Sequence, residues 1–194
     1  MDIGIKEVDG NASHDRTEDG RRFIFFNEDK ATLFYSGMEK LHRWEELSIE
    51  EKKAVNSYSH ENVHNRQKEN WEISIKNRKG KLNYVISEAL TELIGRKHTL
   101  DYFCEVNKNI NRKDLENRLN EHGAYNPAAN YLNEYLKSLN KKDIFNEIEE
   151  KLKTIDHNKV VDNLLDIINN NKGQDYKLKE TDLAKIIKGE RYNE

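Results

Sequence analysis

A helical period runs from Gly37 to the C-terminal end of the chain and limits its fold more than any other feature. Apolar residues recur every three or four positions, as on one face of an α-helix. The clearest stripe ends at Leu93, and Gly95 follows where a helix-terminating glycine is expected. The pattern predicts one helix that begins after Ser48 and further helices over residues 38–47, 82–93, 100–107, 112–121, 126–139, 143–155, 160–169 and 181–187.

The N-terminal segment has a different period. Residues 1–20 are polar and read either as a loose arm or as a first strand around Ile3 and Ile5 followed by a loop. Residues 22–26 and 32–35 are rich in aromatic and β-branched side chains, and five residues of turn character separate them. That spacing predicts a β-hairpin, which needs a helical layer beneath it to be stable.

The predicted fold is therefore α+β and predominantly α-helical. The hairpin packs on a helical layer, and an antiparallel array of short helices follows it. The predicted divisions are a flexible arm over residues 1–20, a hairpin with a helical core over 21–123, and a C-terminal helical subdomain over 124–194. The last two divisions are also compatible with one domain.

Composition excludes several classes of function. The 33 basic and 36 acidic residues are interspersed and give a formal charge of −3, so no global field favours nucleic acid or an anionic membrane. The single cysteine, Cys104, rules out an internal disulfide framework. No apolar run approaches the roughly 20 residues that a membrane-spanning helix requires. These features predict a protein of the host-cell cytoplasm, or an effector exported without a classical signal.

One local segment departs from this balance. Between Asn65 and Lys81 there are six basic residues against two acidic ones, a local charge of +4. Such a patch with an aromatic residue can bind a phosphate backbone, although a solvated loop has the same composition. The candidate binding residues are Lys76, Arg78, Lys79, Lys81 and Trp71.

The only spacing typical of catalysis is His60-Glu61-Asn62-Val63-His64, on the helix that Ser48 and Glu51 begin with a capping-box pattern. Two histidines four residues apart project from one face of a helix and can bind one Zn²⁺. The glutamate between them can act as the general base on a metal-bound water.

The position of these histidines on the helix favours a different interpretation. They lie away from the apolar side marked by Val55 and Tyr58, and a solvent-exposed face is expected for them. The residues that share this face are polar: Lys53, Asn56, Ser57 and Gln67.

Residues 55–92 resemble the gluzincin branch of the zinc metallopeptidases. In that family a second helix carries a glutamate followed four residues later by another acidic residue, and Glu88-Ala89-Leu90-Thr91-Glu92 is similar. The resemblance implies that His60, His64 and Glu88 bind zinc and that Glu61 is the base. It also implies that Glu92 orients a histidine, and that His98 or Tyr102 stabilises the oxyanion.

Three functions follow as hypotheses. The first is a non-catalytic protein that binds another protein and needs no cofactor, such as a regulator or inhibitor encoded by a phage or mobile element. The alternative is a zinc-dependent hydrolase that uses His60, Glu61 and His64. The lesser alternative is nucleic-acid binding through residues 66–81. The sequence gives no oligomeric state.

Overall fold

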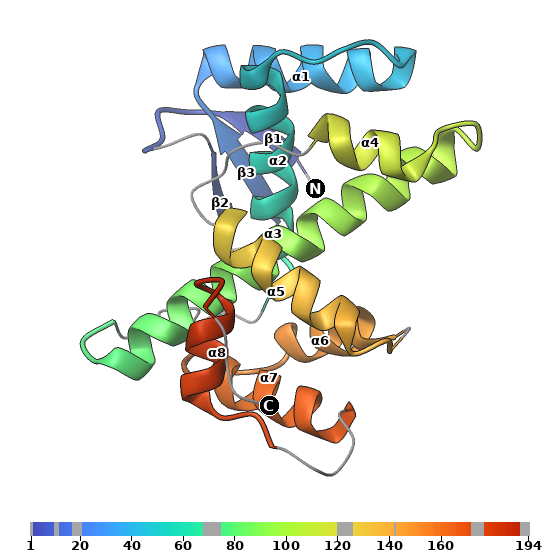
Figure 1. Ribbon diagram of the computed structural model, residues 1–194. Coiled ribbons are helices and arrows are strands. Elements are labelled where there is room, and N and C mark those ends of the chain that lie inside the picture. Colours follow the sequence, from blue (N-terminus) through green and yellow to red (C-terminus); the bar gives the residue numbers. More distant parts are fainter. Residues whose placement is uncertain are drawn as a thin grey trace. The chain divides into compact units, whose positions relative to one another are not determined.

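A computed structural model describes residues 2–9, 12–16, 21–67, 75–119, 126–141, 143–171 and 177–190. It confirms the predicted class: a small three-stranded sheet is followed by helices (Figure 1). The elements are β1 (Asp2–Ile5), β2 (Ser13–Arg16), β3 (Arg22–Phe26), α1 (Glu28–Arg43), α2 (Ile49–His64), α3 (Arg78–Val106), α4 (Arg112–Leu119), α5 (Asn126–Ser138), α6 (Ile144–Leu152), the 3₁₀ turn η1 (His157–Lys159), α7 (Val160–Asn171) and α8 (Glu180–Ile186).

The chain divides into two compact units. Unit 1 comprises residues 1–66 and 94–123, and unit 2 comprises residues 67–93 and 124–194, so that α3 contributes to both. The division after residue 123 coincides with the predicted start of a C-terminal subdomain. The divisions after residues 66 and 93 were not predicted, because the helical period of residues 82–93 does not show to which unit they belong.

The sheet of unit 1 has the strand order β1-β3-β2, with β1 parallel and β2 antiparallel to β3. Residues 1–20 therefore contribute the two strands β1 and β2. The structure agrees with the interpretation of this segment as a strand and not with that of a loose arm. Ile24 and Phe26 of β3 are fully buried in the core of unit 1. The described hairpin pairs β3 with β2, which precedes it in the sequence.

The prediction of a strand over residues 32–35 was wrong, because these residues belong to α1. Asn27 has an extended backbone just before the helix. Acidic residues occupy the first turn of α1, where their negative charge interacts favourably with the positive end of the helix dipole. The buried positions Ala31, Phe34, Gly37 and Leu41 are three or four residues apart. Their helical spacing outweighs the strand preference of the aromatic side chains.

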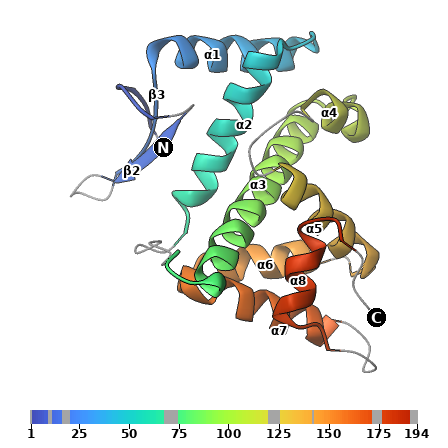
Figure 2. The ribbon, with the colours of Figure 1, turned by 60° about the vertical axis from the view of Figure 1, so that its left-hand side comes forward.

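Helix α2 begins as predicted. The Ser48 hydroxyl accepts a hydrogen bond from the Glu51 backbone N–H at 3.2 Å, and the Glu51 carboxylate accepts one from the Ser48 N–H at 2.7 Å. This reciprocal capping box fixes the start of the helix that carries the two histidines. In unit 1, α2 lies beside the part of α3 that follows Ile94 and runs antiparallel to it (Figure 2).

Helix α3 corrects a second prediction, since it continues through Gly95 where an end was expected. A Cβ atom at Gly95 would lie 2.9 Å from the backbone carbon and oxygen of Ser59 on α2. The hydroxyls of Ser59 and Thr99 form a hydrogen bond one turn further along. Thus Gly95 is required by the close approach of two helices, and the two helices predicted over residues 82–93 and 100–107 are parts of one helix.

Unit 2 contains the short helices α5 to α8, whose positions agree with the predicted period to within a few residues. Asn83 ties the start of α3 to the start of α7. Its side chain donates to the Asn158 carbonyl at 2.7 Å and accepts from the Val161 N–H at 2.9 Å. Among the described helices of both units, none combines the length and apolarity that a membrane span requires.

Candidate functional site

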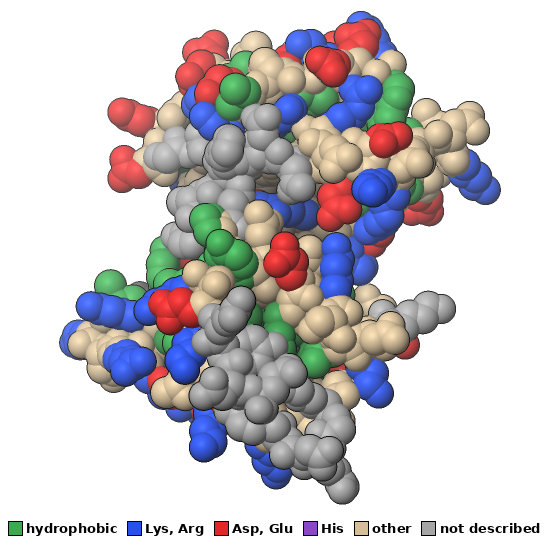
Figure 3. Space-filling view, viewed as in Figure 1, with side chains coloured by type: hydrophobic (Ala, Val, Ile, Leu, Met, Phe, Trp, Pro, Cys, Tyr) green, Lys and Arg blue, Asp and Glu red, His purple; other side chains and the backbone are tan. Residues whose placement is uncertain are grey.

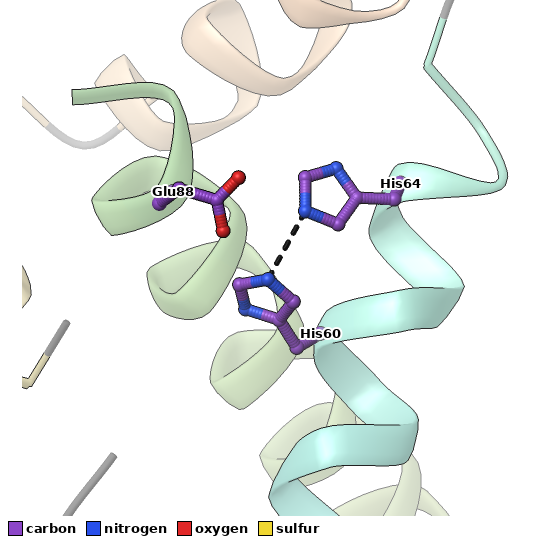
Figure 4. A group of neighbouring side chains, drawn as sticks. All are labelled: His60, His64 and Glu88. Atoms are coloured by element: carbon purple, nitrogen blue, oxygen red, sulfur yellow. Dashed lines mark hydrogen bonds between the residues drawn. The ribbon is translucent and has the colours of Figure 1, made fainter. Parts of the chain in front are cut away.

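The two histidines of the H-E-x-x-H segment face one another near the C-terminal end of α2. Their Nε2 atoms are 3.0 Å apart, and the ring planes are inclined by 72° (Figure 4). One nitrogen donates its proton to the lone pair of the other. When both rings adopt the tautomer that carries the proton on Nδ1, both Nε2 atoms offer a lone pair, as the nitrogen ligands of a metal ion do.

The histidines are not on a solvated face, and this expectation was wrong. Only 9 % of His64 is exposed, His60 is half-buried, and Gln67 is buried. The reason is that β2 covers this side of α2: the His14 ring stacks on His64 with the centroids 5.2 Å apart. In unit 2, Gln67 donates to the Thr91 hydroxyl at 3.0 Å.

The glutamate between the histidines is held by the same strand. The Nδ1 atom of His14 lies 2.6 Å from Oε2 of Glu61, and both side chains are largely buried. The pair fixes the direction of the Glu61 carboxylate and occupies one of its two oxygens. Sequence analysis missed His14, because β2 is a four-residue polar strand without an apolar alternation that would reveal it.

The acidic candidates lie on the unit 2 part of α3. Glu88 is 6 % exposed and Glu92 is 8 % exposed, which is unusual for carboxylates. His98 and Tyr102, the two residues considered for oxyanion stabilisation, lie on the unit 1 part of α3. Both line a cavity of that unit together with Asn62. The structure thus brings together His60, His64, Glu61 and His14 within unit 1.

The basic segment has a less uniform environment. Lys76, Arg78, Lys79 and Lys81 are exposed in unit 2, and Figure 3 shows Lys and Arg side chains over the start of α3. Lys79 donates to both Asp162 oxygens at 2.8 and 2.9 Å, which raises its pKa and neutralises part of the patch. Trp71 lies outside the described residues. Nucleic-acid binding by this segment stays a prediction.

Comparisons with protein-family models, with curated proteins and with solved structures find no match to this chain.

Proposed function

We propose that the chain binds a zinc ion through His60, His64 and Glu88 and uses it for hydrolysis. The distance of 3.0 Å between the two Nε2 atoms carries this proposal. Two nitrogen ligands at the usual zinc distance and at a tetrahedral angle are about 3.3 Å apart. The distance between the two Nε2 atoms needs to increase only slightly for both nitrogens to bind one ion.

The proposal takes Glu88 of α3 as the third ligand, as the resemblance to metallopeptidases implies. Gly95 contacts the α2 backbone at Ser59, and Glu88 precedes Gly95 by seven residues, or about two helical turns, on the same face. The resemblance to metallopeptidases assigns Glu88 to this role, and Figure 4 labels it with the two histidines. Three protein ligands leave a fourth position for water, as in catalytic zinc sites.

Zinc would lower the pKa of that water and supply a hydroxide nucleophile at neutral pH. In the proposal Glu61 accepts the proton, and His14 fixes the orientation of its carboxylate through the 2.6 Å hydrogen bond. The proposal thus gives His14 a positioning role that the resemblance to metallopeptidases did not include.

Metal analysis tests this proposal. Protein purified without chelators, incubated with zinc and desalted, is expected to retain about one ion per chain. His64→Ala and Glu88→Gln should lose the ion, whereas His42→Ala and Glu105→Gln, which change exposed residues of α1 and α3, should keep it. Glu61→Gln should bind zinc and lose hydrolysis of a peptide library. Equal zinc contents in all variants would contradict the site.

A second function, binding of another protein, is favoured by large apolar side chains on the surface of unit 1. Tyr35, Ile49 and Val106 are all more than half exposed, at 56 %, 53 % and 54 %. A partner isolated from the native host should bind the wild-type chain and not the variant Tyr35→Ser/Val106→Ser. Equal binding by both would contradict a role for this surface.

A further inference from the structure

Unit 1 contains a cavity of about 350 Å³ lined by side chains of α1, α2 and α3. Its volume is within the range of small-molecule binding sites. Aromatic rings form much of the wall. Phe34 and Tyr58 are 4.6 Å apart between centroids, and Tyr102 and Phe103 are 5.1 Å apart with their planes nearly perpendicular. These walls suit a flat, apolar ring.

The charged side chain that lines the cavity favours a ligand with a negative charge. Arg66 lines the cavity, and no Asp or Glu does so among the described residues. Burial raises the pKa of Tyr58, and the positive charge of Arg66 opposes this effect. The guanidinium of Arg66 is therefore close enough to interact electrostatically with the Tyr58 phenol. A guanidinium forms paired hydrogen bonds with a carboxylate or a phosphate.

Asn62 provides a further polar contact. Its Oδ1 atom is buried and has no hydrogen-bond donor among the described residues. Such an acceptor is costly in the interior of a protein. Rotation of the amide exchanges its oxygen and nitrogen, so that the side chain can offer either group to a ligand in the cavity that it lines.

We infer that this cavity binds a small aromatic molecule that carries one anionic group, either a carboxylate or a phosphate. The ring packs between the aromatic walls, the anion pairs with Arg66, and a polar atom of the ring bonds to Asn62. This binding site does not depend on the zinc proposal, since it uses neither His60, His64 nor Glu88.

Three probes test the inference on the full-length protein by NMR titration. Indole-3-acetate has a ring and a carboxylate, indole lacks the carboxylate, and acetate lacks the ring. Indole-3-acetate is expected to bind at least about tenfold more tightly than either of the others. Adenosine monophosphate is the phosphate probe, and tighter binding of this probe than of indole-3-acetate would assign the anion as phosphate.

Two variants locate the binding. Arg66→Gln should weaken the better probe about tenfold. Arg43→Gln, which changes an exposed arginine of the same unit outside the cavity, should not. Asn62→Leu should weaken indole-3-acetate without lowering the melting temperature, because it removes an unpaired acceptor. Equal affinities for indole and indole-3-acetate, no effect of Arg66→Gln, or no binding below about 10 mM would overturn the inference.

Discussion

Glu51 shows how much one side chain can contribute to unit 1. Its carboxylate is buried and accepts hydrogen bonds from the Ser36 hydroxyl at 2.6 Å, from Lys40 Nζ at 2.9 Å and from the Ser48 backbone at 2.7 Å. Burial raises its pKa, but the three donors outweigh this effect and lower the pKa to about 2. The ionised form is therefore favoured by the folded chain.

This pKa predicts a pH-dependent stability. The unfolded value is 4.5, so between about pH 4.5 and pH 2 the unfolded chain binds a proton that the folded chain does not. The contribution, at most about 3 kcal/mol, is complete above pH 4.5 and is lost as the pH falls towards 2. Glu51→Gln should destabilise the protein at pH 7 and much less at pH 3, as measured by urea unfolding. A constant difference would contradict this role.

Gly95 allows a second prediction at this scale. In most helices Gly→Ala stabilises by about 1 kcal/mol. Gly95→Ala should instead destabilise by about 2 kcal/mol, because the new Cβ would meet the Ser59 backbone, which cannot move aside. Gly37→Ala is the matched control, since its closest neighbour is the Val55 side chain at 3.0 Å, which can adjust. Thermal unfolding of both variants measures the difference, and equal effects would contradict it.

At the scale of single residues, sequence reasoning identified the spacing of the candidate residues and missed their surroundings. The spacing of His60 and His64 was visible, but their burial depends on β2, which has no sequence signal of its own. His14 could not be linked to Glu61, because 46 residues separate the two in the chain. The cap at Ser48 was predictable because both of its partners are local.

Two asparagine side chains form hydrogen bonds with the backbone of segments that connect helices and strands. Asn169 accepts from the Leu178 N–H at 2.6 Å and donates to the Leu178 carbonyl at 3.1 Å. Asn27 makes the same pair of hydrogen bonds with Val8, at 2.9 and 3.2 Å. Each asparagine thus holds a connecting segment to the end of a helix, because one amide offers both a donor and an acceptor.

Asn169→Asp tests this role. The carboxylate keeps the acceptor and loses the donor, and it faces the Leu178 carbonyl oxygen. The expected cost is about 2 kcal/mol in urea unfolding. Asn170→Asp makes the same change at an exposed position of the same helix and should have little effect. The role is excluded if the two variants are equally stable.

At the scale of elements, the helical period predicted most of the helices well. The two wrong predictions have a common cause. In both, tertiary packing outweighs the local conformational preference of the residues. Residues 32–35 have strand-forming side chains but bury Phe34 as part of a helical stripe. Gly95 has the chemistry of a helix end but lies where another helix approaches closely. Such contacts between distant segments are not visible in a local pattern.

For the whole molecule, zinc should be linked to unfolding. An ion that binds only the folded chain adds about 2.7 kcal/mol at one hundred times its dissociation constant. The gain should decrease at acid pH, because protons compete for imidazole ligands. Calorimetry with and without zinc should show this shift for the wild type and for His42→Ala, but not for His64→Ala. A shift that survives in His64→Ala would place the ion elsewhere.

The discontinuity of unit 1 has a consequence for synthesis on the ribosome. The core of this unit combines Ile24 and Phe26 with Phe103, Leu115 and Leu119, which are added to the chain much later. The first 66 residues therefore leave the ribosome without the side chains that cover their apolar surface. We expect this core to stay incomplete until α4 has been translated, and during that interval the exposed apolar surface favours chaperone binding and aggregation.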